Sequence, residues 1–429
     1  MALLKKLIIK HGRLINTADK IGENIDILIE DGKVVAIGSD LCDSDAQVID
    51  ARGMVVSAGL IDIHVHLREP GFEYKETIET GCAAAAHGGF TAIACMPNTK
   101  PVVDTPELVN FVKDQAAKAC GVRVLPIAAV SKGQKGQELT DAISLAQAGV
   151  AAFSDDGVPI QDANLMRDAL LIAREHKLPI LTHSEDAGMV CNHAVNEGEV
   201  SRKLGIPGRP AIAEEIMIMR DAMLAEETGS AVHICHVSTA RSVDIVRQYK
   251  KKGVRITCET CPQYFTLTEE EVLGQGTMAR VNPPLRTQMD VEGIIEGLLD
   301  GTIDAIVTDH APHSAEEKAR PLTEAPSGMV GLETSLAVTL TALYHTGKMD
   351  LSAILRKMTA EPARILGLDM GRLAIGSDAD IVIFNPDEEW VVDPEQFASK
   401  GRNTPFGGHK LKGKVKYTIV GGNVIFQNK

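Results

Sequence analysis

The chain has 429 residues, of which 44% are hydrophobic and 24% are charged, and its formal net charge is −14. This length exceeds that of one small domain and suits a large barrel with a second module. The acidic balance makes nucleic acid and anionic membrane surfaces poor partners, so an anionic small molecule would need a local cationic group to bind.

The N-terminal segment is predicted to consist of short β-strands joined by turns. Asp31-Gly32 separates two of these strands and is a typical hairpin signal. The strands are indicated by runs rich in β-branched residues, at Leu7–Ile9, Ile25–Ile29, Lys33–Ile37 and Val55–Val56. We therefore expect residues 1–56 to form the first half of a small β-sandwich.

From residue 57 the pattern changes to strand, loop and helix in alternation. Eight short apolar segments end near His66, Met96, Ala128, Ser154, His183, His236, Cys258 and Asp309. Helical patterns lie between them, at Thr105–Cys120, Ala163–His176, Pro210–Glu227, Thr239–Lys252 and Val291–Leu299. This alternation predicts an α/β fold, a (β/α)8 TIM-type barrel over residues 57–367. A doubly wound open sheet is the alternative, but no glycine-rich phosphate loop follows the first strand.

The C-terminal segment returns to β character after two more helical patterns at Leu332–Thr346 and Leu351–Leu366. Strands are predicted at Ala379–Phe384, Trp390–Val392 and Val415–Val420, with a hairpin turn at Gly421-Gly422-Asn423. We expect residues 368–429 to complete the sandwich begun by residues 1–56, so that both ends of the chain build one domain. Residues 311–327 are predicted to be a polar loop after the last barrel strand.

The cysteines and the N-terminus indicate a cytoplasmic protein. Most of the eight cysteines lie inside apolar segments, as reduced core residues do. The sequence from Met1 to Lys6 leads straight into a strand pattern without a signal-peptide core. No apolar run approaches the ~20 residues needed to span a bilayer.

Side chains that bind metals gather at the predicted strand ends. Active sites of such barrels lie at the C-terminal ends of the strands. These ends carry His64, His66, Asp155, Asp156, His183, His236 and Asp309. Asp155 and Asp156 are adjacent, and both are candidates for the metal ligand after the fourth strand. Imidazole and carboxylate ligands without cysteine are typical of zinc or a similar divalent ion.

This ligand count favours two metal ions that share a bridging carboxylate. Such ions make hydroxide available near neutral pH and polarise a carbonyl group for attack. A carboxylate must then carry the proton to the leaving nitrogen, and we assign this role to Asp309 in addition to metal binding.

Four further residues are candidates for binding the substrate. Arg68 is expected to share a strand face with His66 and offers a planar fork for a carboxylate. Asn98 and Asn282 follow the second and seventh strands, and His313 lies four residues past Asp309. Together they indicate a small, flat amide that carries a carboxylate.

Each feature also has a plainer explanation when taken alone. Asp155-Asp156-Gly157 and the two asparagines are typical of turns. His183 could cap a helix, and residues 309–313 could be a solvated loop. The metal-site interpretation gains its weight because all these features fall at the strand ends of one predicted barrel.

These residues resemble the amidohydrolase superfamily, and within it the longer, sandwich-bearing type of bacterial dihydroorotase. The resemblance rests on Asp62-x-His64-x-His66 and on the segments His66–Gly71, Met96–Thr99, Asn282–Arg286 and Thr308–His313. It implies the reversible cyclisation of N-carbamoyl-L-aspartate to (S)-dihydroorotate in pyrimidine synthesis, with Asp309 as the acid/base.

The resemblance also implies a complete set of site residues and ligands. The expected metal ligands are His64, His66, Asp156, His183, His236 and Asp309, holding two Zn²⁺ ions bridged by Asp156 and hydroxide. The family's spacing to His183 favours Asp156 over Asp155 as the bridge. The expected substrate contacts are His66, Arg68, Asn98, Asn282, His313, Ser327 and Gly328. A homodimer or higher homo-oligomer is expected, and association with aspartate transcarbamoylase is an open possibility.

Two other functions are compatible with the sequence. A related cyclic amidase (dihydropyrimidinase, hydantoinase or allantoinase) is one, because Gln263 stands where dihydroorotases commonly carry histidine. A catalytically silent barrel serving as a subunit of a larger assembly is the other, although such a chain is expected to lose metal ligands, and this one keeps them.

Overall fold

The larger part of the chain forms a barrel of eight parallel strands, seen in a computed structural model that describes residues 6–16, 20–190 and 193–428. Neighbouring strands in the barrel pair in the order of the sequence. The strands are β6 (Leu60–Val65), β7 (Phe90–Cys95), β8 (Arg123–Ala128), β9 (Ala152–Phe153), β10 (Ile180–Thr182), β13 (Val232–Ile234), β14 (Ile256–Thr260) and β15 (Ala305–Ile306). All eight coincide with strands predicted from the sequence, which confirms the barrel.

The first and last strands meet through contacts that follow β15. Val65 forms a parallel bridge with His310, and the His66 N–H donates to the His310 carbonyl at 2.9 Å. Asp62 is fully buried and accepts from the Thr308 N–H at 3.0 Å and the His64 N–H at 2.9 Å. One carboxylate on β6 therefore ties the start of the barrel to its end, two residues before His64.

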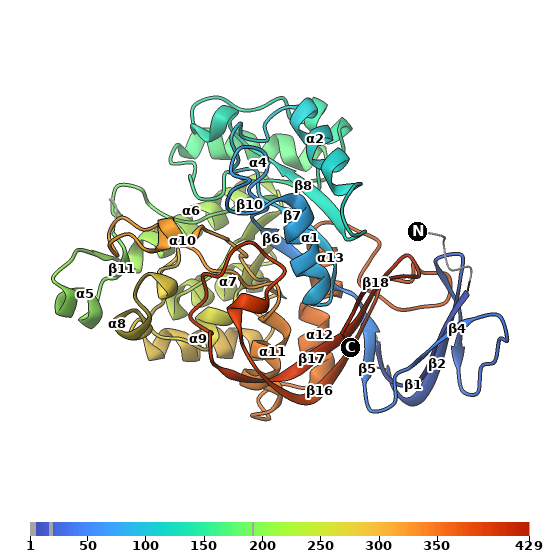
Figure 1. Ribbon diagram of the computed structural model, residues 1–429. Coiled ribbons are helices and arrows are strands. Elements are labelled where there is room, and N and C mark those ends of the chain that lie inside the picture. The colour runs from blue at the N-terminus through green and yellow to red at the C-terminus, as the bar shows by residue number, and fades with distance from the viewer. Residues whose placement is uncertain (1–5, 17–19, 191–192, 429) are drawn as a thin grey trace.

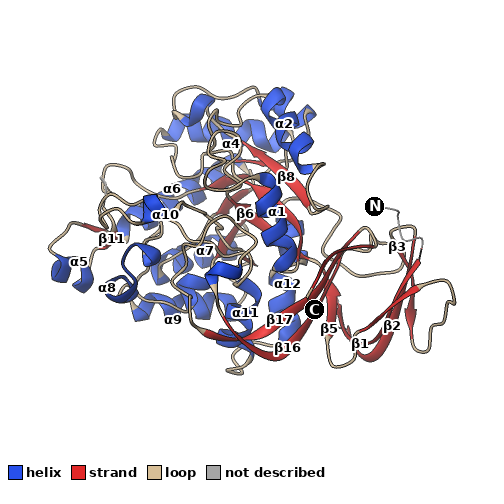
Figure 2. Cartoon of the chain, in the orientation of Figure 1, coloured by secondary structure: helices blue, strands red, loops and turns tan. Residues whose placement is uncertain are grey.

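Helices surround the barrel strands (Figure 2). Each of α4 and α7 begins at a polar residue whose side chain accepts from a backbone N–H of the first turn, and packs an apolar face inward. The helices are α1 (Ile78–His87), α2 (Pro106–Ala116), α3 (Ala142–Gln147), α4 (Ala163–Glu175), α5 (Glu199–Leu204), α6 (Ile212–Thr228), α7 (Ala240–Lys251), α8 (Glu271–Gln275), α9 (Gln288–Leu299), α10 (Ala315–Lys318), α11 (Ser335–Thr339), α12 (Leu351–Lys357) and α13 (Ala360–Ile365).

Both ends of the chain contribute to a second, strand-rich domain beside the barrel. Its strands are β1 (Lys6–Asn16), β2 (Lys20–Glu30), β3 (Lys33–Gly38), β4 (Gln47–Asp50), β5 (Val55–Ala58), β16 (Ile381–Val391), β17 (Lys410–Val420) and β18 (Asn423–Gln427). β5 pairs in antiparallel fashion with β16, so the N-terminal strands (blue) and C-terminal strands (red) join in one sheet (Figure 1). This confirms that the two termini build one domain; the boundaries at residues 56 and 367 stay predictions.

One predicted loop differs from the structure. Residues 311–327 are predicted to be a polar loop, but they contain the short helix α10. The Ser314 side chain accepts from the Glu317 N–H while Glu317 reaches back to the Ser314 N–H, and this reciprocal cap stabilises the single turn. The Ser-x-x-Glu spacing is the sequence signal for this helix.

Two further predictions concern the state of the cysteines and the lack of a membrane-spanning segment. Seven cysteines are free thiols, and five of these are buried. Cys191 lies outside the described residues. Within the described part of the chain, no helix has the length and apolar character needed to cross a membrane.

Replacing Asp62 with alanine tests the closure of the barrel. Two buried N–H groups lose their acceptor in Asp62→Ala, and we expect the free energy of unfolding to fall by about 2–4 kcal/mol. Scanning calorimetry of the two proteins measures the change as a lower melting temperature. Asp168→Ala, at an exposed position of α4, is the control and should be neutral. Unchanged melting of Asp62→Ala would contradict the role given to this carboxylate.

Candidate active site

Four imidazoles surround the carboxylate of Asp156 at the C-terminal ends of the barrel strands. The Asp156 Oδ1 atom lies 3.4 Å from His64 Nε2, 3.5 Å from His183 Nδ1 and 3.6 Å from His236 Nε2. The Asp156 Oδ2 atom lies 3.5 Å from His66 Nε2. These five side chains come from β6, β9, β10 and β13 or the residues just beyond them, and all are buried.

The cluster is strongly polarised although water hardly reaches it. Burial alone raises the pKa of Asp156, but the charge of His64 and contacts with His183 and His236 hold it well below its usual range. Burial lowers the pKa of His64 and His183, yet Asp156 raises that of His64 well above normal, and Asp156 with Glu185 raises that of His183 to about 9. The arrangement therefore favours positive charge at its centre.

Three atoms of these side chains make no hydrogen bond to any described residue. They are His64 Nε2, Asp156 Oδ1 and His236 Nδ1, and all three are buried. Buried polar atoms rarely remain without a partner. His64, Asp156 and His236 can place one ligand atom each within 4.8 Å of one another, and so can His64, His66 and Asp309. Nitrogen and oxygen atoms at this spacing fit a divalent metal ion.

Asp309 joins the cluster from the segment after β15. Its Oδ1 atom lies 3.0 Å from His66 Nε2 and 3.6 Å from His64 Nε2. The backbone of Asp309 has a φ of 48°, in the left-handed region that non-glycine residues seldom adopt. The next residue, His310, points elsewhere and lies 3.2 Å from the buried Glu76. The turn thus directs the carboxylate toward the metal-binding cluster and the adjacent imidazole into the protein.

The structure distinguishes the two adjacent aspartates. The Asp155 side chain accepts from the backbone N–H groups of Val130 at 2.8 Å and Ser131 at 3.1 Å, and from the Ser131 hydroxyl. Burial raises its pKa to about 6. Asp155 therefore fastens the loop after β8, whereas Asp156 faces the imidazoles, as the predicted bridge requires.

A deeper carboxylate, which is not among the residues predicted from the sequence, orients His64. Glu259 on β14 is fully buried and accepts from His64 Nδ1 at 2.6 Å and from His233 Nε2 at 3.0 Å. The other ring nitrogen of His233 lies 2.8 Å from the Thr257 hydroxyl. With Nδ1 of His64 engaged in this way, Nε2 is the nitrogen that faces Asp156 and Asp309. The signal in the sequence is a glutamate directly after the buried strand predicted to end at Cys258, where a buried carboxylate requires a partner.

Next to the cluster is a cavity of about 180 Å³ at the mouth of the barrel. Its lining includes every predicted site residue except His64, which lies beneath it: His66, Arg68, Asn98, Asp156, His183, His236, Asn282, Asp309, His313, Ser327 and Gly328, together with Gly157 and Ala311. Segments separated by more than two hundred positions therefore meet at one rim.

Arg68 lines this cavity, but its side chain is not directed there by the strand alternation predicted from the sequence. β6 ends at Val65, and Arg68 has a φ of 63°, so its direction is set by a left-handed turn. Its Nε–H donates to the Pro312 carbonyl at 3.2 Å, and its Nη2 lies 3.4 Å from His313 Nε2. Burial lowers the pKa of the guanidinium, which still remains a cation at neutral pH.

The two predicted asparagines contact ligand histidines. His66 Nδ1 donates to Asn98 Oδ1 at 2.9 Å, while the Asn98 amide nitrogen lies 3.4 Å from Asp156 Oδ2. The Asn282 amide nitrogen lies 3.3 Å from His183 Nε2, and Asn282 Oδ1 accepts from Arg209. Arg209 was not predicted from the sequence; it also pairs with Glu185 and thereby fixes the orientation of Asn282.

The loop after α10 forms the remaining wall. His313 Nε2 lies 2.9 Å from the Ser327 carbonyl, and burial with the nearby Arg68 charge holds the pKa of His313 well below its usual range. Gly328 has a φ of 136°, and a Cβ there would lie 2.9 Å from the Ala311 carbonyl oxygen. Glycine is therefore required where the backbone passes closest to the cavity.

Comparisons with known proteins agree with this geometry. The family model for dihydro-orotase-like proteins matches residues 53–242, and the amidohydrolase family model matches residues 302–426. A dihydroorotase of Pelotomaculum thermopropionicum is 51% identical over 99% of both chains. A dihydroorotase of Clostridioides difficile is 48% identical over 98% of this chain and 99% of its own. Among solved structures, the L-hydantoinase of Arthrobacter aurescens aligns with a TM-score of 0.89 at 28% identity, over 98% of this chain and 96% of its own.

The contact between Glu259 and His64 predicts the metal affinity of a variant. Glu259→Gln cannot accept charge-assisted bonds from both His64 and His233, and we expect the affinity for Zn²⁺ to fall about 10- to 100-fold. Competition with a chromophoric chelator measures this affinity directly. Glu269→Gln, at another buried carboxylate outside the site, is the matched control and should bind Zn²⁺ like the parent protein. Equal affinities in the two variants would rule out this role of Glu259.

Proposed function

The chain belongs to the dihydroorotase family of the amidohydrolases, and we propose that this site interconverts N-carbamoyl-L-aspartate and (S)-dihydroorotate, with Asp309 as the general acid/base. The observation that carries the proposal is a guanidinium, that of Arg68, lining the same small cavity as the metal-binding cluster. A substrate held there would present an amide to the cluster and an anionic group to Arg68. Dihydroorotate has both, on one flat ring.

The side chains of the cavity have distinct tasks in this reaction. Divalent metal ions held by the cluster would supply Lewis acidity, which activates water and polarises the amide carbonyl. Asp309 receives the proton of the attacking water and returns it to the ring nitrogen as the amide bond breaks. In ring closure, Asp309 takes the proton of the attacking ureido nitrogen and passes it to the hydroxyl group, which leaves as water. Its position 3.0 Å from His66 keeps its carboxylate at the cluster.

We propose that the substrate is oriented by groups on three sides of the cavity. Arg68 forms a bidentate pair with the ring carboxylate. Asn98 and Asn282 offer amide groups beside the ligand histidines. His313, which is kept neutral by its buried surroundings and lies beside Arg68, contacts the ring together with the backbone of Ser327-Gly328. Each is a fixed polar group, which limits the orientations a bound ring can take.

The proposed cofactor is a pair of Zn²⁺ ions in each subunit. The donor set that supports it consists only of imidazole nitrogens and carboxylate oxygens, from His64, His66, Asp156, His183, His236 and Asp309. Six ligand side chains are more than one tetrahedral ion uses, and the two oxygens of Asp156 face different histidines. We propose that Asp156, together with hydroxide, is shared between the ions.

We also propose a homo-oligomeric protein of the cytoplasm. The free thiols among the described cysteines support a reducing compartment. Ile212, Ile216, Met219 and Met223 form an exposed apolar stripe on α6, with exposures of 38–56%, which supports self-association. The association with aspartate transcarbamoylase stays a prediction.

A related cyclic amidase is the second candidate function. The likeness to an L-hydantoinase favours it, because that protein has the same overall fold at 28% identity. Hydantoins and dihydropyrimidines need not carry a carboxylate, however, and would leave Arg68 without an anionic partner. The full ligand set speaks against a catalytically silent barrel.

Arg68→Met distinguishes the two enzymatic functions. We expect kcat/KM for dihydroorotate to fall about 10²- to 10³-fold, because a buried charge pair with the substrate is lost. Steady-state assays on dihydroorotate, dihydrouracil, hydantoin and allantoin measure the specificity of parent and variant. Arg320→Met, at an exposed arginine near the same rim, should behave like the parent. Normal dihydroorotate kinetics in Arg68→Met would refute the carboxylate assignment.

Metal analysis tests the proposed cofactor. Exhaustive chelation should abolish turnover, and titration of the apoprotein with Zn²⁺ should restore it with an end point near two ions per chain. Asp156→Asn should lower the measured stoichiometry, since its amide cannot bridge two cations. Turnover that survives complete removal of metal would contradict the mechanism.

A further inference from the structure

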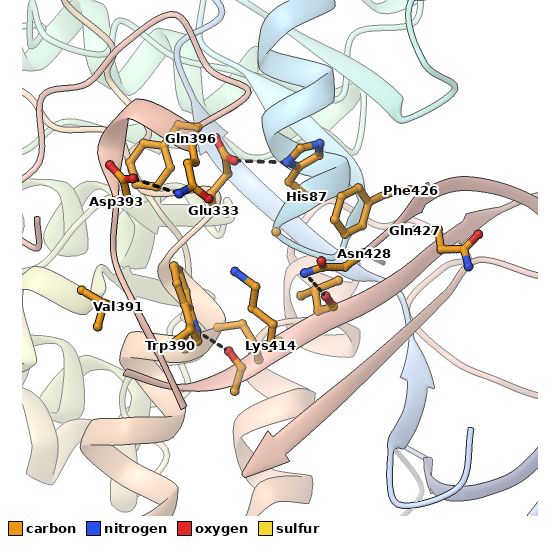
Figure 3. Close-up of a pocket in the computed structure, with 16 residues that line it drawn as sticks. His87, Glu333, Trp390, Val391, Asp393, Gln396, Lys414, Phe426, Gln427 and Asn428 are labelled. Atoms are coloured by element: carbon orange, nitrogen blue, oxygen red, sulfur yellow. Dashed lines mark hydrogen bonds and ion pairs between the residues drawn. The ribbon is translucent and has the colours of Figure 1, made fainter. Parts of the chain in front are cut away.

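A second, larger cavity lies where the strand-rich domain meets the barrel. Its volume is about 560 Å³, and it shares no lining residue with the catalytic cavity. The walls come from the end of α1, from α11 and from β16, β17 and β18 with the residue that follows (Figure 3). A cavity of this size is within the range of sites for small organic molecules.

Lys414 places a cationic group inside this cavity. Its Nζ atom lies 3.8 Å from the centre of the Trp390 ring. The indole N–H of Trp390 donates a hydrogen bond to the Gly413 carbonyl at 2.9 Å, which fixes the ring. Among the described residues, Lys414 has no ion pair and no hydrogen bond to an acceptor. The lysines two positions before and after it on β17 do pair with glutamates, Lys412 with Glu389 and Lys416 with Glu388.

The carboxylates of the cavity are already engaged by other groups. Glu333 accepts from the backbone N–H groups of Ala398 and Ser399 at 3.0 to 3.2 Å, and lies 3.4 Å from His87 Nδ1. Asp393 accepts from the Glu395 N–H and the Gln396 side chain. Both carboxylates therefore have hydrogen-bond donors, and Lys414 is the charged group among the described lining residues without a hydrogen-bonding partner.

The walls around Lys414 offer flat apolar surfaces and amides. The Phe426 ring packs against His87 with ring centres 4.3 Å apart and ring planes tilted by 38°, and Figure 3 shows both facing the cavity opposite Trp390 and Lys414. Gln427 and Asn428 lie at its edge. Aromatic walls bind planar rings by stacking, and amides bind the polar edges of heterocycles.

We propose that this cavity is a binding site for a small aromatic anion of the nucleoside monophosphate class. The phosphate pairs with the Lys414 ammonium, and the base lies against the aromatic wall of His87 and Phe426. This site is separate from the catalytic centre, so its occupation does not require the proposed dihydroorotase activity.

Trp390 supplies a site-specific probe, because it is the single tryptophan of the chain. We expect uridine or adenosine 5′-monophosphate to change its fluorescence saturably in the full-length protein. Isothermal calorimetry gives the affinity independently of the fluorophore. Uridine and inorganic phosphate, which lack the anion and the ring respectively, should each bind at least tenfold more weakly than the nucleotides.

Two variants assign the binding to this cavity. Lys414→Met should weaken nucleotide binding at least tenfold by calorimetry, whereas Lys416→Met, the matched lysine outside the lining, should bind like the parent. Turnover of dihydroorotate should be unchanged in both, which also shows that both fold. The proposal is overturned if neither nucleotide binds, if Lys414→Met binds as tightly as the parent, or if inorganic phosphate binds as tightly as the nucleotides.

Discussion

The structure depends on one buried carboxylate, that of Asp156, held among four imidazoles. A carboxylate and four ring nitrogens cannot satisfy one another by hydrogen bonds alone, and atoms on His64, His236 and Asp156 remain unpaired. A buried anion without full compensation costs several kcal/mol. Positive charge at the centre removes that cost, either as protons on the histidines or as metal ions. Folding alone thus leaves buried polar atoms of the cluster without partners, and a bound cation would provide them.

A second layer of buried carboxylates keeps this cluster in place. Asp62 joins β6 to the segment after β15, Glu259 fixes the ring of His64, and Glu76 holds His310 next to Asp309. Each links segments far apart in the sequence, and each is fully buried. The positions of the groups that we propose to be catalytic are consequently set by the same hydrogen bonds that close the barrel, which links the stability of the fold to the geometry of the site.

Much of the fold and site could be predicted because strand periodicity and the rule for barrel active sites are local patterns. They place His64, His66, His183, His236 and Asp309 at one rim without any knowledge of side-chain direction. The choice between Asp155 and Asp156 depends on which carboxylate turns inward, and the residues alone leave it open. Arg68 was placed in the right cavity for a wrong reason, since a φ of 63° and not strand alternation directs it. Glu259 and Arg209 act through partners in other elements, and no local pattern reveals such pairs.

The division of labour between barrel and loops explains how one scaffold serves different cyclic amides. The L-hydantoinase of Arthrobacter aurescens has nearly the same fold at 28% identity. Under the proposed function, we assign substrate choice to groups around the metal-binding cluster, namely Arg68, His313 and the backbone of Ser327-Gly328. That backbone is itself anchored, because the buried Lys318 ammonium donates to the carbonyls of Pro326 at 3.1 Å and Gly328 at 3.0 Å. Burial, together with the Arg280 charge, lowers the pKa of Lys318 to about 7. The hydrogen bonds to these carbonyl groups must therefore offset the free-energy cost of removing the ammonium group from water. The wall that we assign to substrate selection thus rests on the side chains of Lys318 and also of Asn403, which donates to the Gly328 carbonyl at 3.0 Å. The groups that we assign to the chemistry lie at the ends of the barrel strands.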